Sequence, residues 1–291
     1  MLNLVKFLFL TLPIFSFGCT GSNVETDRQL SNEFKDYWFD GTAEINSFKL
    51  LQSRYGETRE GHAVLIFVSE PFSPEKQVKL DNPDDKQGIN VMKLNFVRKF
   101  TTGIYPYSVM LSTFSPLTYY GESTLLKETF SSQEWCGQVF TQLNKYQEGF
   151  AVNSYSYFEE EGDKSIVVRE VFTEDEIWTR IRFSPEELPE GQITVLPGLT
   201  TLRLRHLPLE PVSAEATLSR SENRNIFRLV YETGWELEVT FETQFPYRIQ
   251  AWKELYNGQL TEATLMKTKK LPYWQLNKSG DVVWRDSLDL Q

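Results

Sequence analysis

A two-residue alternation of apolar and polar side chains is the feature that most constrains this chain. In the run WELEVTFE at 235–242 every second residue is apolar, and the run at 227–231 repeats the pattern. Thr233-Gly234 joins the two runs as a tight hairpin turn. Because successive strand residues point to opposite faces, such runs predict antiparallel strands with one face on a core and the other in water.

Similar runs recur along most of the chain, and 14% of the residues are aromatic, which favours strands. Neither a strand–helix–strand rhythm nor an internal repeat is visible. We therefore predict one mainly β domain at 35–291: a large curved or barrel-like antiparallel sheet with a few short helices. Residues 31–38 are expected as a short helix or an extended lead-in, and residues 279–291 as a last strand or a surface-docked tail. The other predicted strands lie at 63–68, 92–97, 154–157, 165–171, 177–183, 202–205, 247–251 and 258–266.

The N-terminal segment has the pattern of an export signal. Lys6 precedes about a dozen mostly apolar residues that end at Gly18. A bilayer-spanning helix needs roughly 20 apolar residues. Residues 1–18 are therefore predicted to be a signal peptide rather than a permanent span, and the protein is expected to be exported.

The pair Gly18-Cys19 resembles the end of a lipobox, the processing site of bacterial lipoproteins. The resemblance implies lipidation of the Cys19 thiol, cleavage before it, and a lipid anchor in the cell envelope. Residues 19–34 then form a flexible tether. Under the sorting rule of that family, Thr20 favours the outer membrane. The alternative is ordinary secretory cleavage after Ser16-Phe17-Gly18, which leaves a soluble periplasmic or secreted protein.

The second cysteine provides a test of the anchor. If Cys19 carries lipid, Cys136 stays unpaired, whereas a free Cys19 can form a disulfide with Cys136 in an oxidising compartment.

Net charge argues against nucleic acid as a partner. The formal net charge is −10, and without residues 1–18, which hold Lys6 and no acid, 29 basic residues face 40 acidic ones. A field of this sign repels phosphate backbones and anionic membrane surfaces.

No catalytic or cofactor motif stands out. His62 and His206 are far apart in sequence and have no metal-ligand spacing, so no metal site and no cofactor are predicted. The acidic groups at 81–85, 159–161 and 174–176 are interpreted as turns or loops, since none has the spacing of a calcium loop.

One aromatic stretch is a candidate ligand groove. Tyr105 and Tyr107 lie in a run rich in aromatic and apolar residues, interrupted by Gly and Pro, and Trp135 and Cys136 lie in a polar segment. A core strand that enters through a turn is the favoured explanation of the tyrosines, and the ligand groove is the alternative. Cys136 is expected to be a small buried apolar residue beside Trp135.

Four stretches of the chain form a recognisable set: YGETREG at 55–61, KLNF at 93–96, TGIYPYS at 102–108 and SQEWCGQ at 132–138. Together they resemble an uncharacterised family of bacterial envelope lipoproteins whose members often carry the label "septum formation inhibitor Maf". True Maf proteins are cytoplasmic nucleotide pyrophosphatases with an α/β fold, and their Ser-x-Arg-Arg motif is absent here. The label therefore does not describe this chain, and the resemblance supplies no catalytic residue.

Three functions are compatible with these observations. The first is a non-catalytic, membrane-anchored binding or carrier module for an apolar or lipidic ligand, since a large aromatic-rich sheet suits such ligands. The second is a structural or interaction subunit of an envelope complex, which predicts an exposed apolar patch. The third, less favoured, is a carboxylate-based hydrolase, which needs two acids and a water in one cleft.

Overall fold

A computed structural model describes residues 29–82, 87–118, 125–147 and 149–290 of the chain. The predicted signal peptide, Cys19 and most of the predicted tether lie outside these residues. Within them the protein is mainly β, as predicted from the alternation. Sixteen strands form one sheet, accompanied by a few short helices.

The described elements follow in chain order. The first half holds α1 (Asn32–Trp38), β1 (Ala43–Arg54), β2 (Glu57–Ser73), β3 (Val78–Lys79), β4 (Ile89–Thr102), β5 (Tyr105–Pro116), β6 (Lys127–Glu134), β7 (Gly137–Tyr146), β8 (Gly149–Ser156), β9 (Lys164–Arg169) and β10 (Phe172–Thr173). The second half holds η1 (Glu174–Glu176), α2 (Ile177–Phe183), η2 (Pro185–Glu187), β11 (Gly191–Leu196), α3 (Leu199–Arg205), β12 (Val212–Arg220), β13 (Asn225–Tyr231), β14 (Glu236–Phe241), β15 (Ile249–Tyr256), β16 (Gln259–Leu271), η3 (Tyr273–Gln275), η4 (Ser279–Val282) and α4 (Val283–Asp286).

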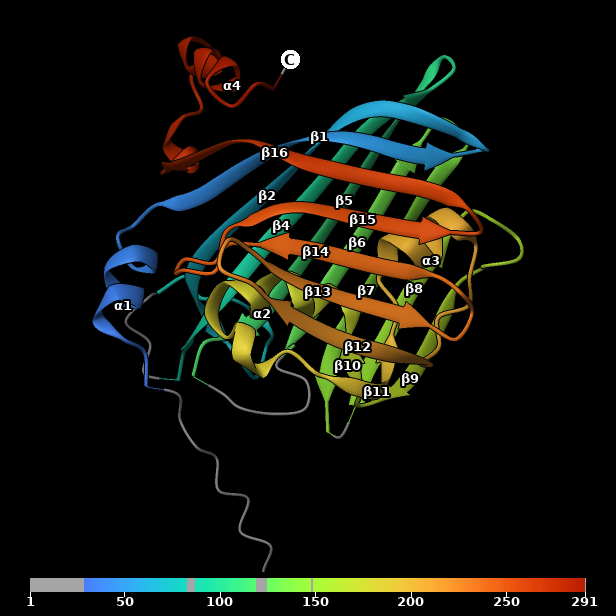
Figure 1. Ribbon diagram of the computed structural model, residues 1–291, viewed down its shortest axis with the longest axis horizontal. Coiled ribbons are helices and arrows are strands. Elements are labelled where there is room, and N and C mark those ends of the chain that lie inside the picture. The colour runs from blue at the N-terminus through green and yellow to red at the C-terminus, as the bar shows by residue number, and fades with distance from the viewer. Residues whose placement is uncertain (1–28, 83–86, 119–124, 148, 291) are drawn as a thin grey trace, which may run out of the picture.

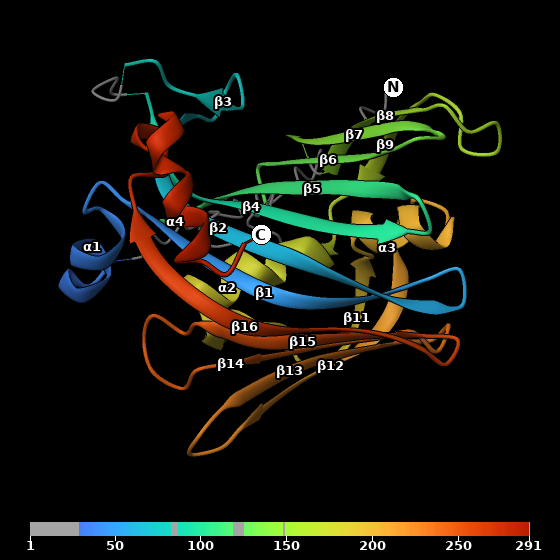
Figure 2. The same cartoon turned by 90° about the horizontal axis from the view of Figure 1, so that it is seen from above.

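The sheet is a long meander, and in its middle the first and last long strands, β1 and β16, pair with each other. Its order is β10-β11-β12-β13-β14-β15-β16-β1-β2-β4-β5-β6-β7-β8-β9, with β3 paired to β2. All pairs are antiparallel except β10–β11. The sheet curls into an open, barrel-like shell (Figure 1). We call the end that carries the β1–β2, β4–β5, β6–β7 and β8–β9 turns the hairpin end; α1 lies at the opposite end (Figure 2).

The chain crosses the inside of this shell between its two edges. β9 and β10 are the outermost strands of the sheet order, yet only Glu170 and Val171 separate them. From β10 the chain continues into α2, every residue of which is buried, and returns to the sheet at β11. Trp178 of α2 contacts Phe96 on β4 and Trp252 on β15, at centroid distances of 5.1 and 5.5 Å. Since these strands belong to different parts of the sheet, α2 fills the interior between them.

Two predicted strands proved to be helices. The run at 177–183 is α2, and the run at 202–205 belongs to α3. In both, alternating arginines looked like a solvent-facing row, but Arg180, Arg182 and Arg203 are buried beside carboxylates or backbone carbonyls. A helix satisfies its own backbone hydrogen bonds, which a segment passing through the shell away from the sheet requires.

The two ends of the described chain pack on the shell. α1 begins at Asn32, because the Ser31 hydroxyl accepts a hydrogen bond from the Phe34 backbone N–H at 3.1 Å. Residues 32–34 therefore belong to a helix rather than to a flexible tether. The C-terminal segment docks on the surface, one of the two predicted outcomes, where Leu288 and Leu290 pack on the outer face of β1 and β2.

A buried ion pair holds α2 to the shell. Arg182 donates to both oxygens of Glu44 on β1 at 2.6 and 2.8 Å, and both side chains are fully buried. Tyr37 and Asn46 also donate to Glu44. Burial alone raises the pKa of Glu44, but the charge and hydrogen bonds of Arg182 outweigh it and lower this pKa to about 2.

Candidate functional site

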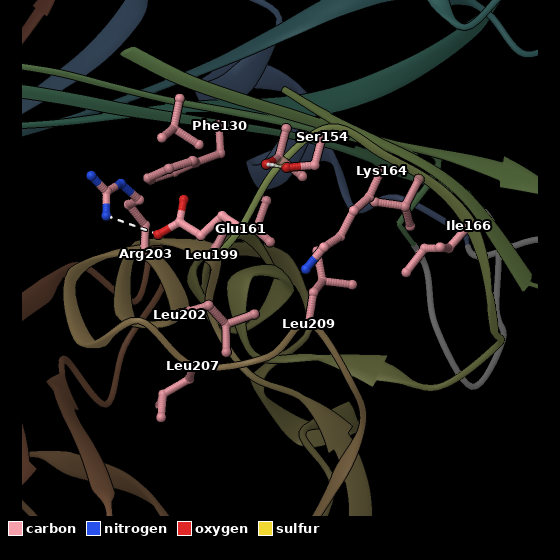
Figure 3. A pocket seen from close by; sticks show the side chains of 13 residues that line it. Phe130, Ser154, Glu161, Lys164, Ile166, Leu199, Leu202, Arg203, Leu207 and Leu209 are labelled. Atoms are coloured by element: carbon pink, nitrogen blue, oxygen red, sulfur yellow. Dashed lines mark hydrogen bonds and ion pairs between the residues drawn. The ribbon is translucent and has the colours of Figure 1, made fainter. Parts of the chain in front are cut away.

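An apolar cavity lies between α3 and the inner face of strands β6–β9 (Figure 3). We call it the α3 cavity; it encloses about 70 Å³. Strand alternation explains the lining, because every second residue of these strands points inward. Its apolar lining residues are Phe130, Val139, Val152, Ile166, Leu199, Leu202, Leu207 and Leu209.

Two hydroxyl residues in the inner wall of the α3 cavity add little polar character to it. Thr141 and Ser154 are the hydroxyl residues in the wall, and their oxygens hydrogen-bond to each other at 2.8 Å. One hydroxyl donates and the other accepts, so each has a polar partner within the wall and only one O–H hydrogen is left over. The inner part of the site therefore favours hydrocarbon over water.

Charged residues lie at the mouth of the cavity. Arg203 of α3 pairs with Glu161 of the β8–β9 turn at 3.0 Å, and His206 contacts the same carboxylate oxygen at 3.0 Å. Lys164, the first residue of β9, also lines the cavity, and its side chain extends toward Leu209 (Figure 3). Within the part of the chain that the structure describes, Lys164 forms no ion pair, so its charge is available to a ligand.

The cavity continues outward into a recess at the hairpin end. This outer recess holds about 420 Å³ and shares Glu161, Lys164 and Leu207 with the α3 cavity. The rest of its lining is Phe158, Glu159, Glu160, His206 and Pro208, so the recess is more polar than the α3 cavity and its charged groups lie on the side of the β8–β9 turn. With the recess included, the space falls in the range of about 300–1,000 Å³ that small-molecule sites occupy.

A second polar cluster lies deeper inside the shell. Glu128, Glu174 and Asp175 are almost completely buried; Tyr231 donates to Glu174, and the Leu199 backbone N–H donates to Asp175 at 2.7 Å. Burial, followed by the charge of Asp175, raises the pKa of both glutamates well above the ordinary value. Burial also raises the pKa of Asp175.

This carboxyl cluster has the wrong surroundings for a hydrolase. Such chemistry needs a water and a substrate in contact with two acids, and each of these three side chains is at most 4% exposed. Gly198 packs so closely that a Cβ on it would lie 2.5 Å from Glu174 Oε1. The cluster therefore fixes the connection between β10, η1 and the start of α3.

The four predicted groove residues lie together at the hairpin end, outside the α3 cavity. Tyr107 is buried and Tyr105 half-buried, and the Tyr105 and Trp135 rings are 6.3 Å apart. Trp135 and Cys136 form the β6–β7 turn, and both are exposed. The expectation that Cys136 is a buried apolar residue was wrong, since a two-residue turn has no layer of structure above it.

Sequence reasoning missed the residues of the α3 cavity. Leu199 and Leu202 were not assigned to a helix, and Glu161 was interpreted as part of a solvated turn. Lys164 and Arg203 carried no motif. The lining comes from segments far apart in sequence, and only their packing brings them together.

The described residues give no sign of a metal centre or a spanning helix. No group of three or more His, Cys, Asp or Glu side chains in them is arranged to hold a metal ion. Nor does any helix among residues 29–82, 87–118, 125–147 and 149–290 have the length and apolar character needed to cross a membrane.

Comparisons with known proteins show a distant structural likeness. No protein-family model and no curated protein matches the chain. Among solved structures, the chain is similar to a β-barrel-like protein of the domain of unknown function DUF1849 from Brucella abortus. The two chains share 9% sequence identity with a TM-score of 0.48, covering 79% of this chain and 97% of that chain. The function of that protein is itself unknown, so the comparison brings no activity to this chain.

Proposed function

We propose that this protein is a non-catalytic binding or carrier module for a ligand with an acyl chain, which it holds in the α3 cavity. The observation that carries the proposal is the hydrocarbon lining of this cavity, whose two hydroxyls hydrogen-bond to each other. The cavity opens past the Lys164 ammonium into the larger outer recess. Burying each methylene of a chain against such a lining contributes about 0.8 kcal/mol.

The dimensions define how a ligand fits. The α3 cavity, at about 70 Å³, is smaller than an engineered cavity of about 150 Å³ that holds benzene. It therefore accepts the end of one acyl chain, and the rest of the chain lies in the outer recess. Lys164 lies where the two spaces join, so a carboxylate or another hydrogen-bonding headgroup near the mouth meets its ammonium.

Edge strand β9 offers a matched pair of variants that tests this site. Ile166 lines the cavity, whereas Val167 points to the opposite face of the same strand. We expect Ile166→Trp to fill the cavity and weaken binding of a fluorescent fatty acid such as cis-parinaric acid by at least about tenfold, the loss of roughly two buried methylenes. Val167→Trp should leave the affinity unchanged.

A second comparison tests the role of Lys164. Lys164→Ala should raise the inhibition constant of oleate but not that of oleyl alcohol, once each is corrected for the variant's affinity for the probe, because of these two competitors only oleate presents a carboxylate. Thermal unfolding of each variant checks the fold. Absence of saturable binding to the wild-type chain, or equal losses in Ile166→Trp and Val167→Trp, would contradict the proposed site.

We further propose that the protein is an exported lipoprotein of the cell envelope, anchored through Cys19 and belonging to the uncharacterised lipoprotein family that it resembles. The sequence of residues 1–20 supports this placement. In the expressed full chain, Cys19→Ser should move the protein from the membrane fraction to the soluble fraction, and mass spectrometry should find acyl chains only on the wild-type N-terminus.

The thiol of Cys136 provides an independent check of the anchor. Cys136 is exposed, and hydrogen bonding to the Glu134 carboxylate raises its pKa. In the mature protein we expect one maleimide-reactive thiol, absent in Cys136→Ser, that labels faster as pH rises because the thiolate is the reactive form. A disulfide between Cys19 and Cys136 would refute the anchor.

A further inference from the structure

Four successive turns at the hairpin end each carry a large exposed apolar side chain. They are Tyr55 in the β1–β2 turn, Ile104 in β4–β5, Trp135 in β6–β7 and Tyr157 in β8–β9, with exposed fractions of 58, 81, 69 and 77%. Because β1 to β9 are neighbours in the sheet apart from β3, these turns follow one another along one end of the shell. We call the four residues the apolar rim.

Contacts join the rim into a continuous surface. Tyr105 beside Ile104 packs against Trp135, and the Tyr157 ring lies directly over Gly137, where a Cβ would be 2.7 Å from it. At the other side, the hydroxyls of Tyr55 and Tyr107 are 2.9 Å apart. The predicted groove residues Tyr105, Tyr107 and Trp135 are thus part of this surface or support it from below.

The rim is held in place rather than frayed. Tyr55 has a φ of 56°, which is costly for an aromatic residue and which Asn or Gly adopts more easily in a two-residue turn. The Arg54 guanidinium lies 4.3 Å above the Tyr55 ring and donates to the Leu204 carbonyl at the end of α3. The first rim residue is therefore linked through Arg54 to the helix that forms the wall of the α3 cavity.

We propose that the apolar rim docks on the surface of a lipid bilayer made of zwitterionic lipids, from which an acyl ligand enters the α3 cavity. This inference rests on the proposed function and names the source of its ligand. The rim is continuous with the mouth of the site, because Phe158 and Glu161, which line the outer recess, belong to the same turn as Tyr157.

The chemistry of the rim fits a bilayer interface better than a protein partner. Tyr and Trp combine an apolar ring with a polar group and prefer the headgroup region of membranes. Narrow turns can insert among headgroups, whereas a stable protein interface needs roughly 800 Å² of complementary surface on each partner. Glu134, Glu159 and Glu160 lie in or beside the turns, and the charge of Glu57 is paired with Arg59, so the rim is not a surface for anionic lipid.

Another exposed apolar group serves as the internal control. Trp274, Val282, Val283 and Trp284 in the C-terminal segment are also exposed, but this segment follows β16 at the α1 end, away from the mouth of the cavity (Figure 2). Val282→Ser/Trp284→Ser removes one aliphatic side chain and one Trp, as Ile104→Ser/Trp135→Ser does, although its residues are 61 and 38% exposed against 81 and 69% in the rim. Comparing the two double variants therefore tests whether vesicle binding depends on where the apolar residues lie or only on their being exposed.

The experiment measures flotation of the chain from Thr20 onward, which holds every described residue and no export segment, with phosphatidylcholine vesicles. We expect the wild-type chain to bind, and Ile104→Ser/Trp135→Ser to lower the partition coefficient at least about tenfold. The C-terminal double variant should bind like the wild type. Adding a minority of phosphatidylglycerol should not strengthen binding, and salt should have little effect.

Several outcomes would overturn the proposal. They are no binding to phosphatidylcholine, binding that requires anionic lipid, or equal losses in the two double variants. Sedimentation of the wild-type chain as a dimer that the rim variant converts to a monomer would also overturn it, since the rim would then bind a second copy of this chain.

The test distinguishes docking from ligand binding. Without vesicles, the rim variant should bind the fluorescent fatty acid with wild-type affinity, whereas Ile166→Trp should lose that affinity and still float. If Ile166→Trp binds the fatty acid normally, the proposed function fails. If the rim variant floats like the wild type while Ile166→Trp loses the fatty acid as expected, the docking inference alone fails.

Discussion

Replacement of Arg182 by methionine should lower the free energy of unfolding by about 3–5 kcal/mol, because it leaves the Glu44 carboxylate buried without its counter-ion. Both side chains are completely buried. The guanidinium also packs on the rings of Trp38 and Phe67, at 5.1 and 4.6 Å from their centroids. A loss of this size is a large part of the roughly 5–15 kcal/mol that stabilises a typical protein.

A double-mutant cycle in urea unfolding tests the pair. Glu44→Gln alone should also destabilise the fold strongly, since it leaves the Arg182 charge buried. Glu44→Gln/Arg182→Met should cost clearly less than the sum of the two single changes. Additive losses would show that the two residues contribute independently.

An exposed ion pair supplies the matched control. Arg228 on β13 and Glu236 on β14 form a diagonal ion pair near the β13–β14 turn, 2.5 Å apart, and both are partly exposed to solvent. Arg228→Met should cost no more than about 1 kcal/mol, because water screens the pair and solvates the remaining charge. A similar loss in Arg228→Met and Arg182→Met would mean that lost packing rather than buried charge dominates.

The sheet was largely predictable from the sequence, whereas its interior was not. Strands β13 and β14 have one face on the core and one outside, so their alternation reports the fold directly. α2 is buried on all sides, so its sequence lacks the alternation of apolar and polar faces that would identify a helix. Arg180 and Arg182 even imitate the outward row of a strand, since the carboxylates that face them lie elsewhere in the sequence or one helical turn away.

The candidate site was predictable only in part. An aromatic run interrupted by Gly and Pro drew attention to Tyr105 and Tyr107, and a polar segment to Trp135; the structure brings these three together. The α3 cavity gave no such signal. It depends on the curl of the sheet, which brings β6–β9 over α3, and a local pattern of residues does not encode that curl.

Stability should fall as pH rises above about 4.5, the ordinary pKa of a glutamate, because of the buried carboxyl cluster. Burial, followed by the charge of Asp175, raises the pKa of Glu128 and Glu174 in the folded protein. Between the unfolded and folded pKa values the folded state keeps protons that the unfolded state has lost. The derivative of the unfolding free energy with pH is then negative, so the contribution is fully present at low pH and is lost as pH rises.

Glu44 acts in the opposite direction at lower pH. Its pKa of about 2 in the folded protein lies below the ordinary value, so its contribution is lost as pH falls from about 4.5 toward 2. The two effects together predict a stability maximum near pH 4–5, lower than the range of about 5–8 in which most proteins are most stable.

Glu128→Gln isolates the cluster's contribution. Glutamine has the shape of a protonated glutamate and can donate to Asp175, as protonated Glu128 does. We therefore expect this variant to raise the melting temperature at pH 8 and to change it little at pH 4.5, while Glu222→Gln on an exposed turn changes neither. An equal loss of stability at both pH values would show that Glu128 is ionised in the folded protein. Burial would then be outweighed by a partner for its carboxylate, and the cluster would be open to the acid–base chemistry that its burial argues against.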